Sequence, residues 1–407
     1  VKEKSDYLVF AAITAFATVG SGLVNFINLR KIILLKFIGQ YEFKRHLKPM
    51  FIFFLTSFAI AIYTTTDSAM LGFMTNDTEV GFYNAAMLKA KEWNDNGGVL
   101  GRQIEIVRYD DKNTAEEATT IAQKIVSDKK VAGVIGHFSS GVCMTAAPLY
   151  QENKIIEISP SASHPEYSKI GDYIFRNNTV ISKEAAASVD IAVNDLGKKN
   201  IGIISIMTDW GTNTSKIIKE LVEKEGNGAK VVAHEEIMEG SDDYSLAITK
   251  LNEAGADVVI CCGMYNLVAP VAKQYKQINP DIAIVGFSNA YSQQLIDLGG
   301  SAVEGVCFPV IFFSESDDEN VMKFVDEYTK AYGAAPSALT AQAYDSVGLL
   351  LTAIKECDTT DSEKVKDKLY EMDYKGVTGD TKFDANGDVD KDFIKVTIKD
   401  GKFIKMN

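Results

Sequence analysis

Five short turns of the sequence gather hydroxyl, amide and aromatic side chains, and each one follows a short apolar run. They read HFSSG at 137–141, PSASHPE at 160–166, MTDWGTN at 207–213, GMYN at 263–266 and FSNAY at 287–291. Such groups can hold a small zwitterion or amide by hydrogen bonds beneath aromatic side chains. No turn combines a nucleophile with a base and an orienting partner, so the pattern predicts binding and not catalysis.

Two of these turns contain residues whose setting favours a ligand. Ser139 and Ser140 stand where a helix is expected to begin, at Ser140 or Gly141, and the first N–H groups of a helix attract an anion. An ordinary serine cap with nothing bound is the alternative. Trp210 follows Asp209 in a polar turn and not on an apolar stripe, which favours a ligand contact over a place in the core.

The sequence gives little support for a metal site, a nucleophile or a nucleotide site. His137 and His164 lie in two of the turns, but a metal site needs several converging ligands and only distant acids accompany them. Cys143 could be a nucleophile, although a small buried residue on a helix is the better interpretation. The string DANGD at 384–388 resembles a calcium loop that lacks its terminal glutamate, so a hairpin turn is expected. No glycine-rich nucleotide motif occurs, and we expect neither a metal nor a cofactor.

Cysteine usage and charge narrow the class of protein further. The five cysteines contain no CxxC pair, and their odd number favours buried thiols over a disulfide framework; they are Cys143, Cys261, Cys262, Cys307 and Cys357. Residues 67–407 hold 34 Lys and Arg against 52 Asp and Glu. An acidic protein repels phosphate backbones, so nucleic acid is not an expected partner.

Short β-branched runs alternate with amphipathic stretches of helix length, which is typical of parallel α/β units. Strands are expected at 103–109, 131–136, 154–159, 201–206, 230–234, 256–261, 282–287 and 303–308. Helices are expected at 85–98 and near 114–129, 141–152, 181–196, 212–226, 243–254, 265–278 and 319–332. So many crossovers exceed one open sheet, and the region 172–180 with its polar turn RNNT is a natural bridge. The sequence therefore predicts two doubly wound lobes, with ligand at the carboxyl ends of the strands.

The first 66 residues have a different character. Two uncharged runs, Tyr7–Ile27 and Pro49–Thr66, flank a short basic loop, and residues 1–66 hold 8 Lys and Arg against 3 Asp and Glu. The first run has the length of a membrane span, and the second is near the lower limit, where a soluble core helix is the alternative. Excess positive charge marks the cytoplasmic side of a hairpin. We therefore expect a transmembrane hairpin that leaves residue 67 onward outside, and it lacks the layout of a cleavable signal peptide.

The N-terminal segment also carries a resemblance of its own. The strings YLVFAAITAFATVGSGLVNFINLRK, HLKPMFIFF and DSAMLGFMTNDTEVGFYNAA resemble the middle of a bacterial polysaccharide flippase, over residues 1 to about 86. Such flippases have about a dozen membrane helices, so this resemblance implies a tether or a non-physiological fusion and not lipid flipping.

The longer part resembles another family. The strings LKAKEWNDNGGVLGRQIEIVRYDD, GVIGHFSSGVCMTAAPLYQENKIIEISPSASHPEYS, FRNNT, MTDWG and GVTGDTKFDANGD resemble the extracytoplasmic solute-binding proteins of ABC importers for branched-chain amino acids and amides, over residues from about 85 to 407. That resemblance implies a type I periplasmic-binding fold whose two lobes close on the ligand, and no reaction. It also implies a monomer that delivers its ligand to ABC permease subunits in the cell membrane.

The resemblance suggests a role for individual residues. It implies that Ser140 and Ser139 hold the ligand carboxylate, that a carbonyl and a hydroxyl of the second turn bind the ligand, and that aromatic walls close the second lobe. The second-turn positions are Ser161, Ala162 and Ser163, and the walls are Trp210 and Tyr265. Amino-acid binders place a carboxylate after the strand that precedes FSNAY, where this sequence has Ser288 and Asn289. Either Asp209 supplies that charge, or the ligand is an amide or another small polar molecule.

The resemblance also divides the chain. Residues 1–66 are expected to form the hairpin, residues 67–177 and 310–375 one lobe, and residues 178–309 and 376–407 the other. The first strand of the first lobe would be MLGFM at 70–74, followed by a loop, TNDTEVG, at 75–81. A membrane-tethered sensory ectodomain is the alternative function, because the same fold serves both.

Overall fold

The computed structural model describes residues 77–406, with the exception of 129 and 226. The chain divides into two compact units, Val1–Ala69 and Met70–Asn407, and the described residues belong to the second. The expected hairpin and the expected strand at 70–74 lie outside the described residues. In the described part of the chain, no helix combines the length and apolar character needed to cross a membrane.

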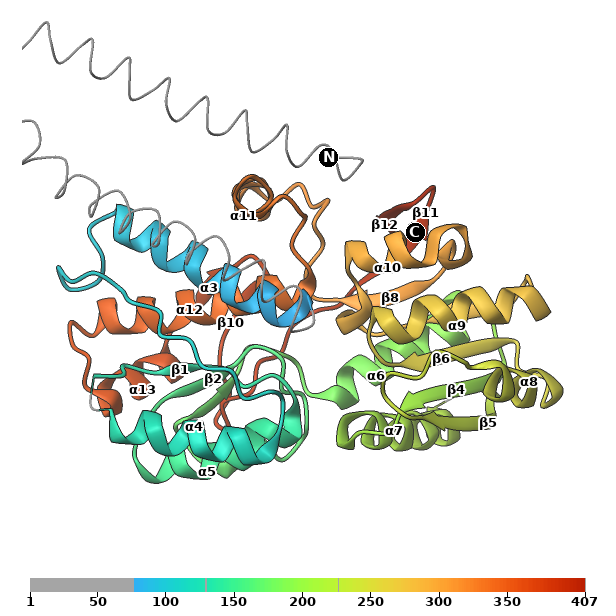
Figure 1. The fold of residues 1–407 in the computed structure, drawn as a ribbon, viewed down its shortest axis with the longest axis horizontal. Coiled ribbons are helices and arrows are strands. Elements are labelled where there is room, and N and C mark those ends of the chain that lie inside the picture. The colour runs from blue at the N-terminus through green and yellow to red at the C-terminus, as the bar shows by residue number, and fades with distance from the viewer. Residues whose placement is uncertain (1–76, 129, 226, 407) are drawn as a thin grey trace, which may run out of the picture. The chain divides into compact units, whose positions relative to one another are not determined.

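The second unit contains two α/β lobes (Figure 1). The first lobe has a parallel three-stranded sheet in the order β1-β2-β3 and a small antiparallel pair, β9 and β10. Its elements are α3 (Asp77–Asp95), α4 (Ala115–Ser127), β1 (Val134–Ile135), α5 (Ser140–Glu152), β2 (Glu157–Ser159), η1 (Ser168–Ile170), β3 (Ile174–Arg176), α12 (Ala338–Glu356), α13 (Ser362–Glu371), β9 (Tyr374–Gly376) and β10 (Gly379–Thr381). Helices α4 and α5 lie beneath the sheet in Figure 1, and α3 and α12 lie above it.

The second lobe has a seven-stranded sheet in the order β12-β11-β8-β7-β6-β4-β5. Strands β4 to β8 are parallel, whereas β11 runs antiparallel to both β8 and β12. Its elements are α6 (Ile181–Asp190), a π-helical turn η2 (Ile191–Asp195), β4 (Asn200–Ile206), α7 (Asp209–Glu225), β5 (Lys230–Ile237), α8 (Ser245–Glu253), β6 (Val258–Cys262), α9 (Tyr265–Ile278), β7 (Ala283–Val285), η3 (Ser288–Ala290), α10 (Gln293–Gly299), η4 (Gly300–Val303), β8 (Cys307–Val310), β11 (Ile394–Lys399) and β12 (Lys402–Lys405).

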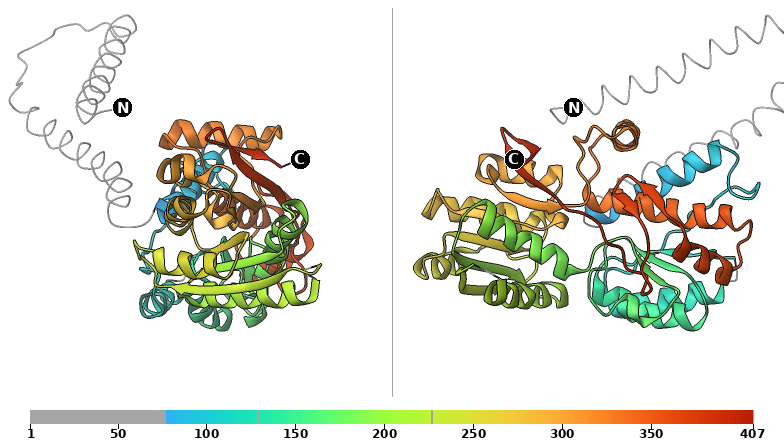
Figure 2. Two further views of the ribbon diagram at one scale, coloured as in Figure 1. Left: turned by 90° about the vertical axis from the view of Figure 1, so that its right-hand side faces the viewer. Right: turned by 180° about the vertical axis from the view of Figure 1, so that it is seen from behind.

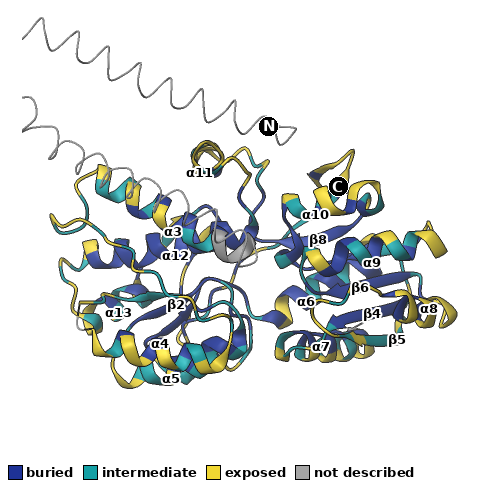
Figure 3. Ribbon diagram, viewed as in Figure 1, coloured by how far each residue is buried: buried dark blue, intermediate teal, exposed yellow. Residues whose placement is uncertain are grey.

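The core of the second lobe explains why its central strands are apolar throughout. Every residue of β6 is buried, and successive side chains enter opposite layers: Val258 and Ile260 pack toward α6 and α7, whereas Val259 packs toward α8 and α9. A strand covered on both faces by helices reads as a continuous apolar run. The reverse view in Figure 2 shows helices on both faces of the sheet, and Figure 3 shows burial concentrated along the strands.

Three segments pass between the lobes: 177–180 after β3, 311–318 after β8, and 382–393 before β11. Helix α11 (Glu319–Tyr332) follows the second and packs on α12, where the Phe324 and Tyr344 rings lie 4.4 Å apart. A buried polar network joins the first and third segments. Asn177 Nδ2 donates to Gln342 O at 2.9 Å, and Lys391 Nζ donates to Asn177 Oδ1 at 2.7 Å.

Most of the expected strands are confirmed, with shifts of a few residues at their ends, but some expectations are wrong. Residues 103–109 form no strand, because the Asn94 side chain occupies both backbone hydrogen-bonding groups of Ile104. Asn94 Oδ1 accepts from Ile104 N at 2.7 Å, and Asn94 Nδ2 donates to Ile104 O at 2.9 Å. Residues 77–81 begin helix α3 and are not a loop. The expected bridge 172–180 contains the strand β3, so only 177–180 connects the lobes there.

Candidate functional site

The first of the five turns lies between β1 and α5. Helix α5 begins at Ser140, as expected, and the Ser139 hydroxyl makes no capping hydrogen bond to it. The Ser140 side chain is buried, and its Oγ accepts from the backbone N–H of Ser163 at 3.2 Å and of His164 at 3.3 Å. Ser140 therefore joins the first turn to the second at the carboxyl end of the sheet.

The second turn packs against the backbone of the first. Ser161 Oγ donates to Phe138 O at 2.6 Å, and the backbone N–H of Ala162 donates to Ser159 Oγ at 3.0 Å. Ala162 and Ser163 are buried. These contacts fix the path of the turn and leave Ser163 facing the second lobe.

The two lobes meet at Ser163 and Trp210. The indole Nε1–H of Trp210 donates to Ser163 Oγ at 3.1 Å, and the Trp210 ring packs edge-on against Phe287 with centroids 5.5 Å apart. Gly211 permits this placement, because a Cβ there would lie 2.1 Å from Ile206 O. The backbone N–H of Ile181, the first residue of α6, also donates to Ser163 O at 2.9 Å.

Asp209 is the first residue of α7 and faces the other lobe. Its Oδ2 lies 3.0 Å from the position that a Cβ on Gly141 would take. The Asp209 carboxylate therefore lies against the first turn of α5, near Ser140. A helix N-terminus favours a negative charge at that place.

The other second-lobe candidates follow the ends of β6 and β7. Tyr265 begins α9 and is half-buried. Ser288 is buried, and Asn289 Oδ1 is a buried acceptor with no hydrogen-bond partner among the described residues. The backbone N–H of Ser288 donates to Glu184 Oε1 at 2.6 Å.

Glu184 is not among the site residues predicted from the sequence. Its side chain projects from the first turns of α6 and is 3% exposed. Burial raises the pKa of its carboxyl to about 7, because desolvation outweighs the hydrogen bonds from Ser288. An acidic residue in the first turn of a helix is ordinarily explained by its favourable interaction with the helix dipole. The local sequence therefore gives no sign that Glu184 is buried.

His137 and Cys143 contact neighbouring polar side chains. His137 Nδ1 contacts Asp111 Oδ2 at 2.5 Å and its Nε2 contacts Tyr150 OH at 3.1 Å. Cys143 is buried, its Sγ lies 3.4 Å from Ser159 Oγ, and burial raises the pKa of its thiol well above the usual value. Across the residues for which side chains are described, no cluster of three or more His, Cys, Asp or Glu could hold a metal ion. All five cysteines are free, and only Cys357 is not fully buried.

The DANGD segment forms a turn, as expected. The backbone N–H of Asp384 donates to Asp388 O at 2.8 Å, and Phe383 pairs with Val389 in an antiparallel bridge. Asp388 Oδ1 then accepts from Arg176 Nε at 2.5 Å, where Arg176 is fully buried at the end of β3. This turn therefore supplies the charge that balances a buried arginine, which also contacts His164 O in the second turn.

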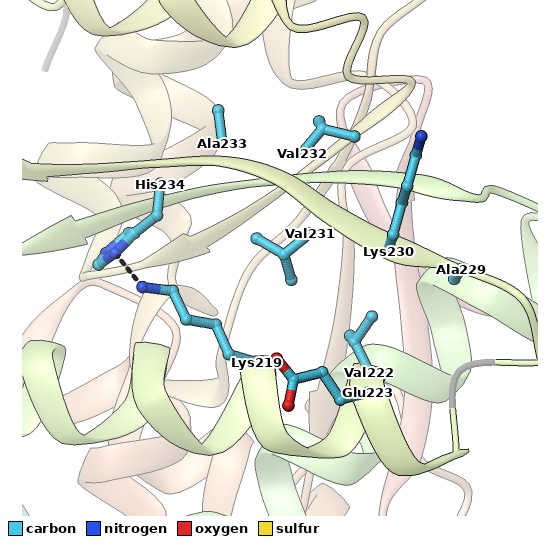
Figure 4. Close-up of a pocket in the computed structure, with 9 residues that line it drawn as sticks. All are labelled: Lys219, Val222, Glu223, Ala229, Lys230, Val231, Val232, Ala233 and His234. Atoms are coloured by element: carbon cyan, nitrogen blue, oxygen red, sulfur yellow. Dashed lines mark hydrogen bonds between the residues drawn. The ribbon is translucent and has the colours of Figure 1, made fainter.

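A hollow of about 390 Å³ lies elsewhere, between α7 and the edge strand β5 (Figure 4). Lys219 Nζ donates there to His234 Nδ1 at 2.8 Å, and Ser205 Oγ lies 2.8 Å from His234 Nε2. Its lining residues 230–234 form the beginning of β5 and not its carboxyl end. Ligands of such sheets bind at the carboxyl ends, so this hollow is a poor candidate for the ligand site.

Comparison with known proteins shows which families the chain resembles. Residues 68–402 match the model of a family described as periplasmic binding protein, and residues 1–90 match one described as polysaccharide biosynthesis protein. A Leu/Ile/Val-binding protein homolog from Brucella abortus is 30% identical over 304 residues, which cover 73% of this chain and 80% of the relative. A leucine-, isoleucine-, valine-, threonine- and alanine-binding protein from Pseudomonas aeruginosa is 28% identical over 306 residues, covering 75% of this chain and 81% of the relative.

A solved structure aligns with the described fold. The branched-chain amino acid transporter substrate-binding protein of Streptococcus pneumoniae, in complex with isoleucine, aligns with a TM-score of 0.74 and 27% identity. The alignment covers 81% of this chain and 95% of that protein. The two-lobed α/β arrangement described above is thus that of a type I periplasmic-binding fold.

Proposed function

The chain belongs to the periplasmic binding protein family, and from this membership we propose that it captures a branched-chain amino acid between its two lobes. It is a solute-binding protein of an ABC importer and not an enzyme. The observation that carries the proposed site is the hydrogen bond from Trp210 Nε1 to Ser163 Oγ, at 3.1 Å between the two lobes. Polar turns from both lobes meet there, at the carboxyl ends of their strands.

The proposed ligand set follows from these turns. The N–H groups that open α5, with Ser139 and Ser140, would hold the ligand carboxylate. Ser161, Ala162 and Ser163 would contribute a carbonyl and a hydroxyl, and Trp210 with Tyr265 would cover the aliphatic side chain. Ser288, Asn289 and Asp209 complete the proposed set. Closure of the lobes around the ligand would bury it.

The proposed setting is the extracytoplasmic side of the cell membrane. The expected hairpin at 1–66 would tether the lobes there, and ABC permease subunits would receive the ligand. The basic loop between its two uncharged runs supports this orientation. We propose the lobe bounds 67–177 with 310–375 and 178–309 with 376–407, except that residues 376–389 go with the first lobe, because β10 pairs with β9 and Phe383 and Val389 pack in its core.

Thermal unfolding of the full chain in detergent, with a panel of small molecules, tests this function. A ligand that binds only the folded state raises Tm, by an amount that grows with its concentration above Kd. We expect leucine, isoleucine and valine to raise Tm, and aspartate and lysine to leave it unchanged. If no aliphatic amino acid stabilised a cooperatively folded protein, the proposal would fail.

A further inference from the structure

The second lobe buries a carboxylate whose charge no described cation balances. Glu184 is 3% exposed, and the hydrogen bonds that act against its desolvation come from Ser288. The backbone N–H of Ser288 donates to Glu184 Oε1 at 2.6 Å. An ionised carboxylate removed from water costs several kcal/mol unless a positive charge accompanies it. The folded protein thus holds a site that a cation would stabilise.

This carboxylate borders the proposed ligand site. Ser288 directly follows Phe287, whose ring packs against Trp210. Helix α6, which carries Glu184, begins at Ile181, and the Ile181 N–H donates to Ser163 O at 2.9 Å. Glu184 thus lies three residues after Ile181, which bonds Ser163, and its partner Ser288 adjoins Phe287, which packs on Trp210. It also lies near Cys262, at the carboxyl end of β6.

We propose that Glu184 is the counter-charge for the ammonium group of the ligand. This inference rests on the proposed function and adds to it the charge pattern that the cleft selects. Asn289 Oδ1, a buried acceptor without a partner among the described residues, lies in the turn that begins with Ser288 and is a second acceptor for the same ammonium. A protonated amine has three N–H donors and needs such a set.

Asp209 is less suitable for this role. Its carboxylate lies against Gly141 in the first turn of α5, where the ligand carboxylate is proposed to bind. Asp209 therefore lies at the carboxylate end of the proposed zwitterion and not at its ammonium end. Glu184 supplies the carboxylate that Ser288 and Asn289 lack, from a different helix. The cleft then recognises a zwitterion, with its carboxylate toward α5 and its ammonium toward α6.

Calorimetric titration of the full chain with L-leucine and with 4-methylpentanoate tests this assignment. The two molecules share a carboxylate and an aliphatic chain, but only leucine carries the ammonium. The wild-type protein is expected to bind leucine at least about 30-fold more tightly than 4-methylpentanoate. This factor is the smallest loss of affinity typical when one partner of a buried charge pair is removed. In Glu184→Gln, leucine affinity falls by a similar factor and 4-methylpentanoate affinity does not fall.

Two further variants separate this effect from general damage. Glu220→Gln removes an exposed charge from α7 in the same lobe and is expected to bind both ligands as the wild type does. Asn289→Ala tests the same subsite if Glu184→Gln fails to fold, and it should weaken leucine alone. If Glu184→Gln kept the wild-type preference for leucine, the inference would be overturned and the proposed function would stand. If the folded wild type bound neither ligand, both would fail.

Discussion

Trp210 and Ser163 are bonded across the two lobes, with the indole Nε1–H donating to Ser163 Oγ at 3.1 Å. They lie 47 positions apart, on α7 and in the turn after β2. Each residue is also held from its own lobe: Ser163 N–H donates to Ser140 Oγ, and the Trp210 ring packs on Phe287. The contact thus closes the proposed cleft with groups that can also bind a ligand.

Truncation of this aromatic wall should weaken ligand binding. We expect Trp210→Ala to reduce the affinity for leucine more than about tenfold, because the indole contributes both apolar cover and a hydrogen bond. Calorimetric titration measures the affinity. Trp93→Ala is a matched control, since Trp93 lies in α3, beside Lys355, and outside the proposed site. Unchanged affinity in folded Trp210→Ala would remove Trp210 from the site.

The buried ion pair of Arg176 and Asp388 should matter for stability. Arg176 is fully buried and its Nε contacts Asp388 Oδ1 at 2.5 Å. Asp388→Asn leaves the guanidinium charge buried without its partner, so we expect the free energy of unfolding to fall by about 3–5 kcal/mol. Urea titration followed by circular dichroism measures this change.

Asp390→Asn serves as the control for that prediction. Asp390 forms an ion pair with Lys183, but its side chain is 81% exposed. An exposed pair contributes at most about 1 kcal/mol. Equal losses of stability in the two variants would mean that burial of Arg176 does not decide the effect.

Gly211 should tolerate no side chain. A Cβ at this position would lie 2.1 Å from Ile206 O, which is a backbone atom and cannot move aside cheaply. Gly211→Ala should therefore displace the start of α7, lowering both Tm and leucine affinity. Thr212→Ala, at the next and exposed position, should change neither. Wild-type affinity and Tm in Gly211→Ala would contradict this close packing.

The buried carboxyl of Glu184 should make stability depend on pH. Its pKa is raised from 4.5 to about 7, so between these values the folded state keeps a proton that the unfolded state has lost. Raising the pH through this window should cost the ligand-free protein on the order of 3 kcal/mol of unfolding free energy. The groups facing Glu184 are Ser288 and the Cys262 thiol, which stays protonated because burial raises its pKa.

Unfolding free energies at pH 5 and pH 8 check this prediction. Glu184→Gln cannot ionise at this position, so its loss between the two pH values should be smaller than that of the wild type by the same amount. Glu220→Gln should behave as the wild type does. If the wild type and Glu184→Gln lost equal stability, Glu184 would not titrate within this window.

The parts of the molecule that could be predicted from sequence are those that neighbouring residues determine. The start of α5 at Ser140 and the turn at 384–388 follow from polar residues beside apolar runs. The strand expected at 103–109 is absent because the side chain of Asn94, nine positions before Gln103, forms hydrogen bonds with the backbone N–H and C=O of Ile104. The alternation of apolar and polar residues cannot reveal a side chain that bonds the backbone groups needed for strand pairing.

The missed features depend on contacts between distant segments. Glu184 meets Ser288 across 104 positions, and Arg176 meets Asp388 across 212. Nothing near Glu184 in the sequence distinguishes it from a solvent-exposed acid in the first turn of a helix. The fold brings these partners together, so neither contact could be predicted from the local sequence.

Calorimetric titration of the full chain with leucine, isoleucine and valine tests the central claim most directly. Capture of a branched-chain amino acid between the lobes predicts saturable binding of at least one of the three, with one molecule bound per chain and a dissociation constant in the micromolar range or below. The absence of binding by all three, in a protein that unfolds cooperatively, would contradict the claim and point to another class of ligand.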